Sequence, residues 1–401
     1  MRLIKIPEDK YDEYKIQAMF DCYKWDPQFC DNATLSKHIL LLTRKENEEI
    51  IKLTKELDKE TRLAEEYLNK NVKIAKKLAL PKKILEQIPN MQNYDKNQNI
   101  RLMRYDFHPS IDNNWVVTEV NSDCPGGFAE SSLLPDIARK TIGIPQLEYH
   151  SFGEKMIKTI NNKLNKKGTI MMVHCTCFSD DRQVMQYLGD RLEKEGYKII
   201  YGAADHIRFQ EKKAYCILDN NQMSVDLIFR FTPLEWLIQM KPRRWDGYFN
   251  TTTISCNHPI SIYAQSKRFP FVWKDLERAG ISMKTWEKLL PETIEVKDVG
   301  SKKGFIYKPV YGRVGEKISI KEACKDDEYE KILQDVKKHP KQYLAQKKFQ
   351  SKPLKSEDGK EYHICLGSYT IEGQHAGYYA RMSLYPRIDS YAEDVPVLIE
   401  K

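Results

Sequence analysis

The sequence predicts a mixed α/β fold (α+β), in which a helical N-terminal region precedes a Rossmann-like open sheet and a strand-rich C-terminal part. Three observations support this prediction. Apolar residues recur at helix-like spacings from about residue 34 to residue 80. Short apolar strands alternate with helix-like segments from about 150 to 240, as in βαβ units. Strand-like segments return after about residue 300.

The length and composition predict a water-soluble protein with a sizeable core. The 401 residues suggest two or three domains, and 41% of them are hydrophobic. The longest apolar stretches, such as Ile39–Leu42 and Ile170–Val173, are too short to cross a bilayer, and the N-terminus turns polar at once. Nine scattered cysteines without a CxxC pair indicate reduced thiols. We therefore expect a cytoplasmic protein that has no membrane partner.

The net charge is mildly basic and does not by itself identify a partner. Lys and Arg number 65 against 57 Asp and Glu, which leaves a formal charge of 65 − 57 = +8. The basic residues are spread along the chain, so a solvated surface and a pocket for anionic substrates both remain open. A nucleic-acid-binding protein would carry a concentrated basic stripe with interleaved aromatic residues, which the sequence lacks. We expect no nucleic-acid partner.

The N-terminal region is predicted to be helical and contains no catalytic signal. Apolar residues recur amid Lys and Glu from about residue 39 to residue 57, and Asn32 or Thr34 is the predicted N-cap. Pro81 and Pro89 then bracket a shorter helix.

Residues 99–122 are predicted to form a β-hairpin. Asn99–Phe107 and Trp115–Asn121 have the composition of strands, and the Asp112-Asn113-Asn114 cluster between them is typical of a turn. The middle of the chain supplies further strands at Thr169–Val173, Tyr197–Tyr201 and Val225–Phe229, with a helix at Asp180–Lys194. No GxGxxG follows the first of these strands, so a dinucleotide site there has no support.

The C-terminal part is predicted to be rich in strands. Phe305–Val310, Gln342–Gln346 and Tyr362–Ile371 have strand-like patterns. Glu372-Gly373 is a candidate hairpin turn, and Gln374–Met382 is the predicted partner strand.

The predicted hairpin places two carboxylates opposite each other. If the turn is centred between Asp112 and Asn113, the antiparallel register sets Asp106 against Glu119 and Arg104 against Asn121. Facing residues have Cβ atoms about 4.5–5.5 Å apart, so two acids need a cation between them. Oxygen ligands of this kind favour Mg²⁺ with substrate phosphates. An exposed sheet face with solvated acids, one of them neutralised by Arg104, is an equally weighted alternative, and a one-residue shift would remove the argument.

A second segment, Tyr307–Gly315, combines a lysine on a strand with a glycine-bearing turn. Lys308 lies on the strand, and Gly312 and Gly315 flank Arg313. Glycines let backbone N–H groups approach phosphate oxygens, and the two basic side chains supply positive charge. No Walker A pattern is present, and a simple hairpin turn is the more frequent explanation of such a segment taken alone.

Four motifs in this order resemble the glutathionylspermidine synthase family of ATP-grasp ligases. They are Arg104-Tyr-Asp106, Glu119-Val-Asn121-Ser-Asp123, Lys308–Gly315 and Gly367–Gly377 with Arg381. The metal hairpin precedes the nucleotide lysine, which is the permuted order of this family. The resemblance extends from about residue 100 to the C-terminus, and we expect the synthetase part alone, without an amidase domain.

The resemblance implies an ATP-grasp fold with a Rossmann-like preATP-grasp domain. The boundaries that follow are a helical N-terminal region at 1–98, a metal-binding hairpin segment at 99–149, a Rossmann-like domain at 150–245 and a nucleotide-binding region at 246–401. Asp106, Glu119 and Asn121 would be the Mg²⁺ ligands, and Arg104 would bind the phosphate and the reacting carboxylate.

The resemblance also implies residues that bind ATP. Lys308 would bind the ATP phosphates, and Lys267, in Gln265-Ser-Lys-Arg268, would be a second ATP lysine. Gln346 and Lys347 resemble the strand whose edge meets adenine. For Lys267 a surface lysine is an equally weighted alternative.

The remaining implied residues contact the substrates. Arg313 would lie on a mobile loop that closes over the transferred phosphoryl group, and Arg381 would be a second arginine near the substrate. Glu235 would lie beside the amine, with a solvated helix-end acid as the equally weighted alternative. Ser122 and Cys124 belong to the loop expected to touch the acid. This loop runs Ser-Asp-Cys-Pro-Gly-Gly127 and departs from the family, so glutathione and spermidine are not implied.

The function implied by the resemblance is an ATP- and Mg²⁺-dependent carboxylate–amine ligase that forms an amide through an acyl phosphate. Its partners would be a small-molecule acid and amine, and a homodimer is a hypothesis that the sequence leaves open. Positioning and charge neutralisation would supply most of the catalysis. The alternative is a non-catalytic member of the same fold that binds ATP as a sensor or scaffold.

Overall fold

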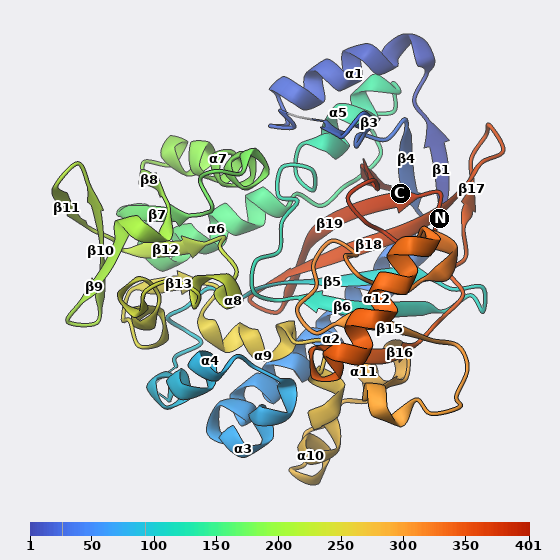
Figure 1. Cartoon of the computed structure of the whole chain (residues 1–401). Coiled ribbons are helices and arrows are strands. Elements are labelled where there is room, and N and C mark those ends of the chain that lie inside the picture. The colour runs from blue at the N-terminus through green and yellow to red at the C-terminus, as the bar shows by residue number, and fades with distance from the viewer. Residues whose placement is uncertain (26, 93) are drawn as a thin grey trace.

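A six-stranded antiparallel sheet lies at the centre of the structure (Figure 1). The computed structural model describes residues 1–25, 27–92 and 94–401. Neighbouring strands follow the order β20-β19-β18-β5-β6, and β17 pairs with β18 beside this path. The strands are β5 (Leu102–Pro109), β6 (Trp115–Asn121), β17 (Leu354–Lys355), β18 (Glu361–Ile371), β19 (Gln374–Ser383) and β20 (Glu393–Val395).

Strands β5 and β6 form the predicted hairpin in the predicted register. Asp106 faces Glu119, and Arg104 faces Asn121. All eight residues of β5 are buried, because β18 flanks the strand on its other side. The predicted facing of the two carboxylates is confirmed.

A β-bulge in this hairpin explains why the predicted register holds although the predicted turn is displaced. The register shifts by one residue between Asp106 and Phe107, and Phe107 faces Val117, which leaves Thr118 as the extra residue. The part of the hairpin next to the turn is therefore centred on Asp112 and not between residues 112 and 113. The bulge offsets that displacement before the strands reach the two acids.

The C-terminal hairpin of β18 and β19 also forms as predicted. Glu372 and Gly373 make its turn with φ angles of 51° and 76°, the left-handed conformation that a two-residue type I′ turn requires at both positions. The long pairing of these strands carries Arg381 to a position opposite Cys365 on β18, the strand that lies between β19 and β5.

The first predicted helix begins later than expected, at α2 (Arg44–Lys70). Thr43 and not Asn32 or Thr34 is its N-cap, and it forms a capping box with Glu46. The preceding residues form β4 (His38–Leu42), which lies between β1 (Arg2–Lys5) and the C-terminal β21 (Val397–Ile399). All five residues of β4 are buried, and its unbroken apolar run Ile39–Leu42 suits a central strand better than one face of a helix.

Helix α2 covers one face of the central sheet (Figure 1). A buried ion-pair cluster attaches it there: Arg101 NH1 lies 2.6 Å from Asp58 Oδ1, and Arg101 NH2 lies 3.0 Å from Glu65 Oε2. Burial raises the pKa of Glu65 to about 7, and Arg101 opposes that rise. The cluster holds the start of β5 and therefore the hairpin that carries the facing acids.

A four-stranded parallel sheet forms the predicted Rossmann-like part. Its order is β13-β12-β7-β8, with β7 (Thr169–Val173), β8 (Lys198–Gly202), β12 (Leu227–Arg230) and β13 (Ile254–Cys256). Helices α6 (Phe152–Leu164) and α7 (Ser179–Lys194) accompany it. Strand β13 lies beyond residue 245, the predicted end of this region. The strand order reverses direction between β7 and β12, and ligands commonly bind at the carboxyl ends of such strands.

A third sheet lies in front of the central sheet in Figure 1. Its order is β14-β16-β15, from β14 (Thr293–Ile294), β15 (Phe305–Pro309) and β16 (Tyr343–Lys347). Helix α12 (Asp326–Lys338) packs on its outer side through Ile332 and Val336, which contact Tyr343. Lys308 on β15 consequently faces the central sheet.

The remaining elements are short or peripheral. They include a small antiparallel sheet inserted between β8 and β12 and a two-stranded ribbon near the N-terminus. Among the described residues no helix is long and apolar enough to cross a membrane. The short or peripheral elements are α1 (Glu8–Phe20), β2 (Gln28–Phe29), β3 (Asn32–Ala33), α3 (Val72–Ala75), α4 (Lys82–Gln87), α5 (Leu134–Thr141), β9 (Ile207–Gln210), β10 (Lys213–Leu218), β11 (Asn221–Ser224), α8 (Leu234–Leu237), α9 (Ile262–Gln265), α10 (Trp273–Arg278) and α11 (Lys284–Leu289).

The buried cluster under α2 gives a test of this fold. Replacing Arg101 with Met leaves two buried carboxylates without their cation, so Arg101→Met is expected to lower the free energy of unfolding by about 3–5 kcal/mol in urea titrations. The control is Arg2→Met, because Arg2 is exposed and pairs with Glu400 at 3.5 Å. The control is expected to change stability by less than about 1 kcal/mol. Equal stability of the two variants would contradict the role given to Arg101.

Candidate functional site

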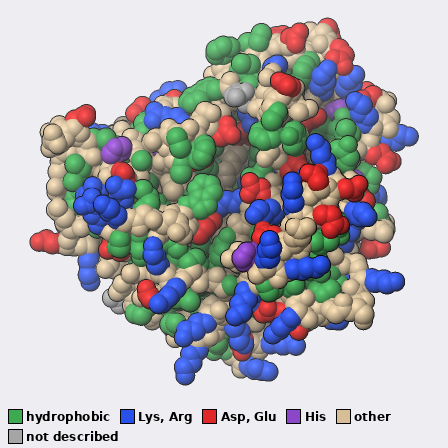
Figure 2. Space-filling model, in the orientation of Figure 1, with side chains coloured by type: hydrophobic (Ala, Val, Ile, Leu, Met, Phe, Trp, Pro, Cys, Tyr) green, Lys and Arg blue, Asp and Glu red, His purple; other side chains and the backbone are tan. Residues whose placement is uncertain are grey.

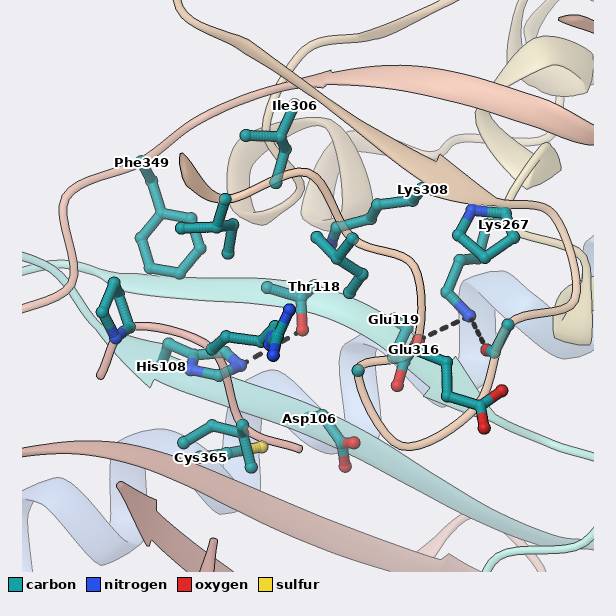
Figure 3. A pocket seen from close by; sticks show the side chains of 18 of the residues that line it. Asp106, His108, Thr118, Glu119, Lys267, Ile306, Lys308, Glu316, Phe349 and Cys365 are labelled. Carbon is teal, nitrogen blue, oxygen red and sulfur yellow. Dashed lines mark hydrogen bonds and ion pairs between the residues drawn. The ribbon is translucent and has the colours of Figure 1, made fainter. Parts of the chain in front are cut away.

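A cavity lies between the β5–β6 hairpin and β15 (Figure 3). Its floor carries Asp106, His108 and Glu119 from the hairpin, and Lys308 faces them from β15. Two other predicted site residues, Lys267 after α9 and Arg381 on β19, also line it. Seven of the residues predicted from the sequence are thus brought close to one another, because Arg104 and Asn121 contact Asp106 directly.

Asp106 is held by two neighbours on the same sheet face. The Arg104 guanidinium donates Nε to Oδ1 at 2.8 Å and NH2 to Oδ2 at 3.0 Å, a two-pronged pair. Asn121 Nδ2 donates to Oδ2 at 2.9 Å. Arg104 also donates NH1 to the Gly126 carbonyl oxygen at 3.1 Å, which ties the sheet to the loop after β6. The arrangement leaves the carboxylate charge fully compensated.

Gly367 makes room for the Arg104 side chain. It lies on β18 between Asp106 and Tyr379, and a Cβ atom there would come within 2.7 Å of Arg104 Cδ. The guanidinium then lies 5.2 Å from the centre of the Tyr379 ring. Gly367 of the last sequence motif is therefore required for a steric reason, because the Arg104 side chain passes over it to reach Asp106.

Glu119 lies between two lysines. Lys267 Nζ is 2.8 Å from Glu119 Oε2 and also donates to the Gly312 carbonyl oxygen at 2.6 Å. Burial would raise the pKa of Glu119, but Lys267, Lys308 and Arg104 outweigh it and hold that pKa at about 2. Glu119 is therefore an anion at neutral pH, and Lys267 is a site residue and not a surface lysine.

Lys308 is a buried cation to which no hydrogen bond is assigned among the described residues. The residue is only 5% exposed, and burial lowers the pKa of its amine to about 8, with Glu119 opposing and Lys267 adding to the shift. Arg381 is similar: its NH1 reaches only the Asp389 carbonyl oxygen at 3.5 Å, and its Nε is buried without a partner. Two under-compensated cations at one cavity provide a place for an anionic ligand.

The loop that follows β15 closes one side of the cavity. Gly315 has a φ angle of 67°, and a Cβ atom there would lie 2.6 Å from the Ile388 carbonyl oxygen, so only glycine fits this approach. Arg313 does not line the cavity. Its guanidinium donates NH2 and Nε to Glu235 Oε1 at 2.7 and 3.1 Å, on the side of α8. The structure therefore joins two predicted residues that the sequence assigned to different roles.

Glu235 is a poorly compensated acid and not a solvated one. Its second carboxylate oxygen is buried without a partner, and burial raises the pKa of Glu235 although Arg313 opposes the rise. Asp123 Oδ2 lies 3.9 Å from Arg313 NH2, so two acids share one arginine. If the loop moved, this pair of acids would be open to a cationic group.

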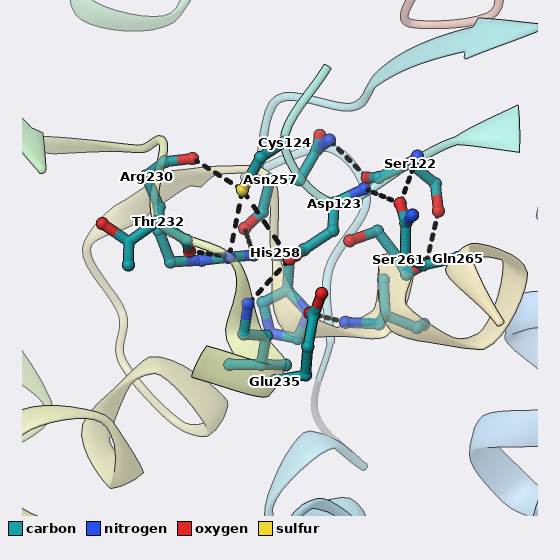
Figure 4. Close-up of polar contacts among 12 residues, drawn as sticks. Ser122, Asp123, Cys124, Arg230, Thr232, Glu235, Asn257, His258, Ser261 and Gln265 are labelled. Carbon is teal, nitrogen blue, oxygen red and sulfur yellow. Dashed lines mark hydrogen bonds and ion pairs between the residues drawn. The ribbon is translucent and has the colours of Figure 1, made fainter. Parts of the chain in front are cut away.

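The Ser122–Cys124 loop is fixed from the Rossmann-like side (Figure 4). Gln265 Oε1 accepts the backbone N–H groups of Ser122 and Asp123 at 2.9 and 3.0 Å. Asp123 pairs with the fully buried Arg230, and its Oδ2 accepts the Leu234 N–H at the start of α8 at 2.8 Å. Cys124 Sγ contacts the same Asp123–Arg230 pair, at 3.7 Å from Asp123 Oδ2.

Sequence reasoning did not select Asp123, Arg230 and Gln265, whose contacts hold the Ser122–Cys124 loop in place. Asp123 lies between the two assigned residues of its loop, and its acidic side chain was the available signal. Arg230 ends a buried apolar strand, where an arginine without a nearby acid in sequence is itself unusual. Its partner lies 107 residues away, so no local pattern could identify it.

Gln346 and Lys347 lie on opposite faces of β16. Gln346 is 4% exposed and lines a second cavity with Glu119, Lys267 and Lys308. Lys347 is exposed, and its Nζ donates to the Lys303 carbonyl oxygen at 2.9 Å. Alternation along the strand turns the Lys347 side chain away from the cavity, so the expectation that this strand edge meets adenine stays a prediction for Lys347.

The donor set suits Mg²⁺ bound together with a polyphosphate. Asp106, Glu119 and Asn121 offer only oxygen ligands from side chains, which is the preference of this ion. In the described part of the chain, no group of three or more His, Cys, Asp or Glu side chains gathers to hold a metal. The under-compensated Lys308 and Arg381 fit the phosphates that would complete the coordination.

The two facing sheets, with acids on one and a lysine on the other beside a Rossmann-like sheet, define the protein as one of the ATP-grasp type. The chain belongs to the family described as "Glutathionylspermidine synthase preATP-grasp", which matches residues 10–400. It is therefore a synthetase-like protein, and the predicted family and fold are confirmed.

The similar solved structures are distant in sequence. A glutathione synthetase-like effector from Globodera pallida, determined in its apo form, aligns with a TM-score of 0.64 over 98% of this chain and 96% of that chain, at 12% identity. A putative gamma-glutamylcysteine synthetase from Methylobacillus flagellatus KT aligns over 83% of this chain and 86% of that chain at 11% identity, and its TM-score of 0.36 carries no argument. No curated protein matches this sequence.

The Arg313–Glu235 ion pair is expected to hold the loop that follows β15 in place. Glu235→Gln removes the charge that anchors Arg313, so trypsin is expected to cleave after Arg313 several-fold faster than in the wild-type protein, as followed by mass spectrometry. The matched control is Glu316→Gln, because Glu316 is exposed on the same loop. Cleavage of Glu235→Gln at the wild-type rate would show that this ion pair does not hold the loop.

Proposed function

We propose that the protein is an ATP- and Mg²⁺-dependent carboxylate–amine ligase. In this reaction a carboxylate oxygen attacks the terminal phosphorus of ATP and ADP leaves. The amine nitrogen then attacks the carbonyl carbon of the acyl phosphate, phosphate leaves and the nitrogen loses a proton. The observation that carries the proposal is Lys308, a buried ammonium without an assigned hydrogen-bond partner, which faces the Asp106 and Glu119 carboxylates across one cavity.

Mg²⁺ would be held by Asp106, Glu119 and Asn121. When bound, it would supply positive charge to phosphate oxygens during transfer. Arg104 and Lys267 now compensate these two acids, and both side chains would become available to anionic substrate groups once the acids bind the ion. Each acid would thus have a positive charge beside it both before and after the ion binds, and Arg104 and Lys267 would then pair with the substrate anions.

Lys308, Lys267 and Arg381 would neutralise the phosphate charge. They extend from three separate elements into one cavity, so their ammonium and guanidinium groups are positioned before the ligand arrives. Arg104 would orient the reacting carboxylate, since it sits between Asp106 and the Gly126 carbonyl at the loop after β6. The loop around Gly315 would exclude water from the acyl phosphate.

The acid and amine would bind on the Rossmann-like side of the cavity. The Ser122–Cys124 loop would contact the acid, because it leads to Gly126, whose carbonyl oxygen accepts from Arg104, and its Cys124 Sγ contacts the Arg230 carbonyl oxygen on β12. Glu235, with its unpartnered oxygen, would bind the amine after Arg313 leaves. In Figure 2 a hollow opens near the centre of the face shown, with basic and acidic side chains interspersed over most of that face.

A binding test separates the two lysines that the sequence grouped together. Lys308→Met is expected to weaken Mg·ATP binding at least about tenfold in calorimetry, because a buried phosphate partner is lost. Lys347→Met is expected to stay within about twofold of the wild-type protein, because its side chain points away from the cavity. Equal effects of the two substitutions would contradict the assigned nucleotide site.

A turnover test addresses the reaction itself. With Mg·ATP, a panel of small carboxylic acids and of amines is expected to contain a pair that stimulates ADP release, and omission of either member is expected to abolish the stimulation. Asp106→Ala is expected to remove the activity, because it deletes a metal ligand. ATP binding without stimulated ADP release would favour the non-catalytic alternative, which the internal pairing of Asp106, Glu119 and Glu235 makes a second candidate.

A further inference from the structure

A second cavity adjoins the first and has a different character. It shares Glu119, Lys267 and Lys308 with the first cavity, but its far wall is apolar and aromatic. That wall is formed by Phe269, Pro270, Trp273, Trp286 and Leu290. A slot of this kind beside a phosphate-binding cavity suits a flat heteroaromatic ring.

Gln346 contributes the one side-chain amide on β16 to this slot. It pairs across the sheet with Thr293 of β14, and its Nε2 lies 3.1 Å from Thr293 Oγ1. No hydrogen bond within the described residues uses its Oε1 atom. Which of the two amide atoms faces the slot decides whether the slot offers a donor or an acceptor.

Thr293 settles the orientation of that amide. A hydroxyl group has a single proton to donate, and Thr293 Oγ1 donates it to the Pro291 carbonyl oxygen at 2.8 Å. The Thr293 oxygen can then only accept, so Gln346 must turn its NH₂ group toward it. Oε1 is left as the amide atom available to a ligand, and the opposite orientation would set two acceptors against each other.

We propose that Thr293 is a positioning residue that locks Gln346 as a hydrogen-bond acceptor, so that the slot selects a purine nucleotide with a 6-amino group over one with a 6-oxo group. The inference rests on the proposed nucleotide site and extends it to base specificity. A 6-amino group donates to Oε1, whereas a 6-oxo group places a second acceptor against it. A buried acceptor without a donor is disfavoured strongly enough to discriminate between such analogues.

The test compares Mg·ATP with Mg·ITP, whose base differs from adenine by the 6-oxo group and the attached ring proton. Affinities are measured by calorimetry for the wild-type protein, Thr293→Val, Thr293→Ser and Gln346→Leu. The wild-type protein is expected to prefer ATP at least about tenfold. Thr293→Val frees the amide to turn, so the preference is expected to fall below about threefold, through a gain in ITP affinity. Thr293→Ser keeps the hydroxyl and is expected to keep the preference.

The controls separate this inference from the proposed function. Gln346→Leu is expected to abolish the preference, and thermal unfolding of each variant checks that the β14–β16 pairing persists. A purely structural role of Thr293 would weaken both nucleotides equally, and an unchanged ATP:ITP ratio in Thr293→Val overturns the inference alone. Equal wild-type affinity for both nucleotides also overturns only the inference. A wild-type protein that binds neither nucleotide overturns the inference together with the proposed nucleotide site.

Discussion

The facing of Asp106 and Glu119 across β5 and β6 is the constraint on which the rest of the site depends. Two carboxylates in register on one buried sheet face repel each other unless cations lie beside them. Arg104 compensates one and Lys267 the other, at 2.8 Å in each case. Gly367 is required because the Arg104 side chain passes over it to reach Asp106, where a Cβ atom would collide with it. The pairing of these charges therefore explains the arginine, the lysine and the glycine together.

The same constraint explains why the site is assembled from distant segments. A hairpin can supply the acids and Arg104, but the lysines and Arg381 must come from elements packed against it. The third sheet carries Lys308, the C-terminal hairpin carries Arg381, and the segment after α9 carries Lys267. Helix α2 holds the opposite face through Arg101, so the hairpin is anchored on the side away from the ligand.

Features set by local contacts could be predicted from the sequence, whereas features set by contacts between distant residues could not. The facing of Asp106 and Glu119 was predictable because alternation and turn position are local properties, and the bulge at Thr118 happened to offset the displaced turn. Strand β4 was mistaken for part of a helix because its partners lie at the two ends of the chain. The motif that placed Lys347 on the strand expected to meet adenine does not state on which face its side chain lies, and in the structure that side chain is exposed.

The Asp123–Arg230 pair was beyond such reasoning because it joins the loop after β6 to strand β12 through a contact between residues 107 positions apart. Arg313 and Glu235 were both selected, but only the folded chain brings them together, with Arg313 turned away from the phosphate cavity. The sequence thus predicted which residues lie together at the facing acids better than it predicted the contacts of the loop around Gly315.

A crystal structure with Mg²⁺ and a non-hydrolysable ATP analogue tests the central claim most directly. The account predicts that Asp106 and Glu119 exchange Arg104 and Lys267 for the metal ion, while the phosphates contact Lys308 and Arg381. A structure in which the nucleotide binds elsewhere, with the Arg104–Asp106 and Lys267–Glu119 pairs intact, would contradict it.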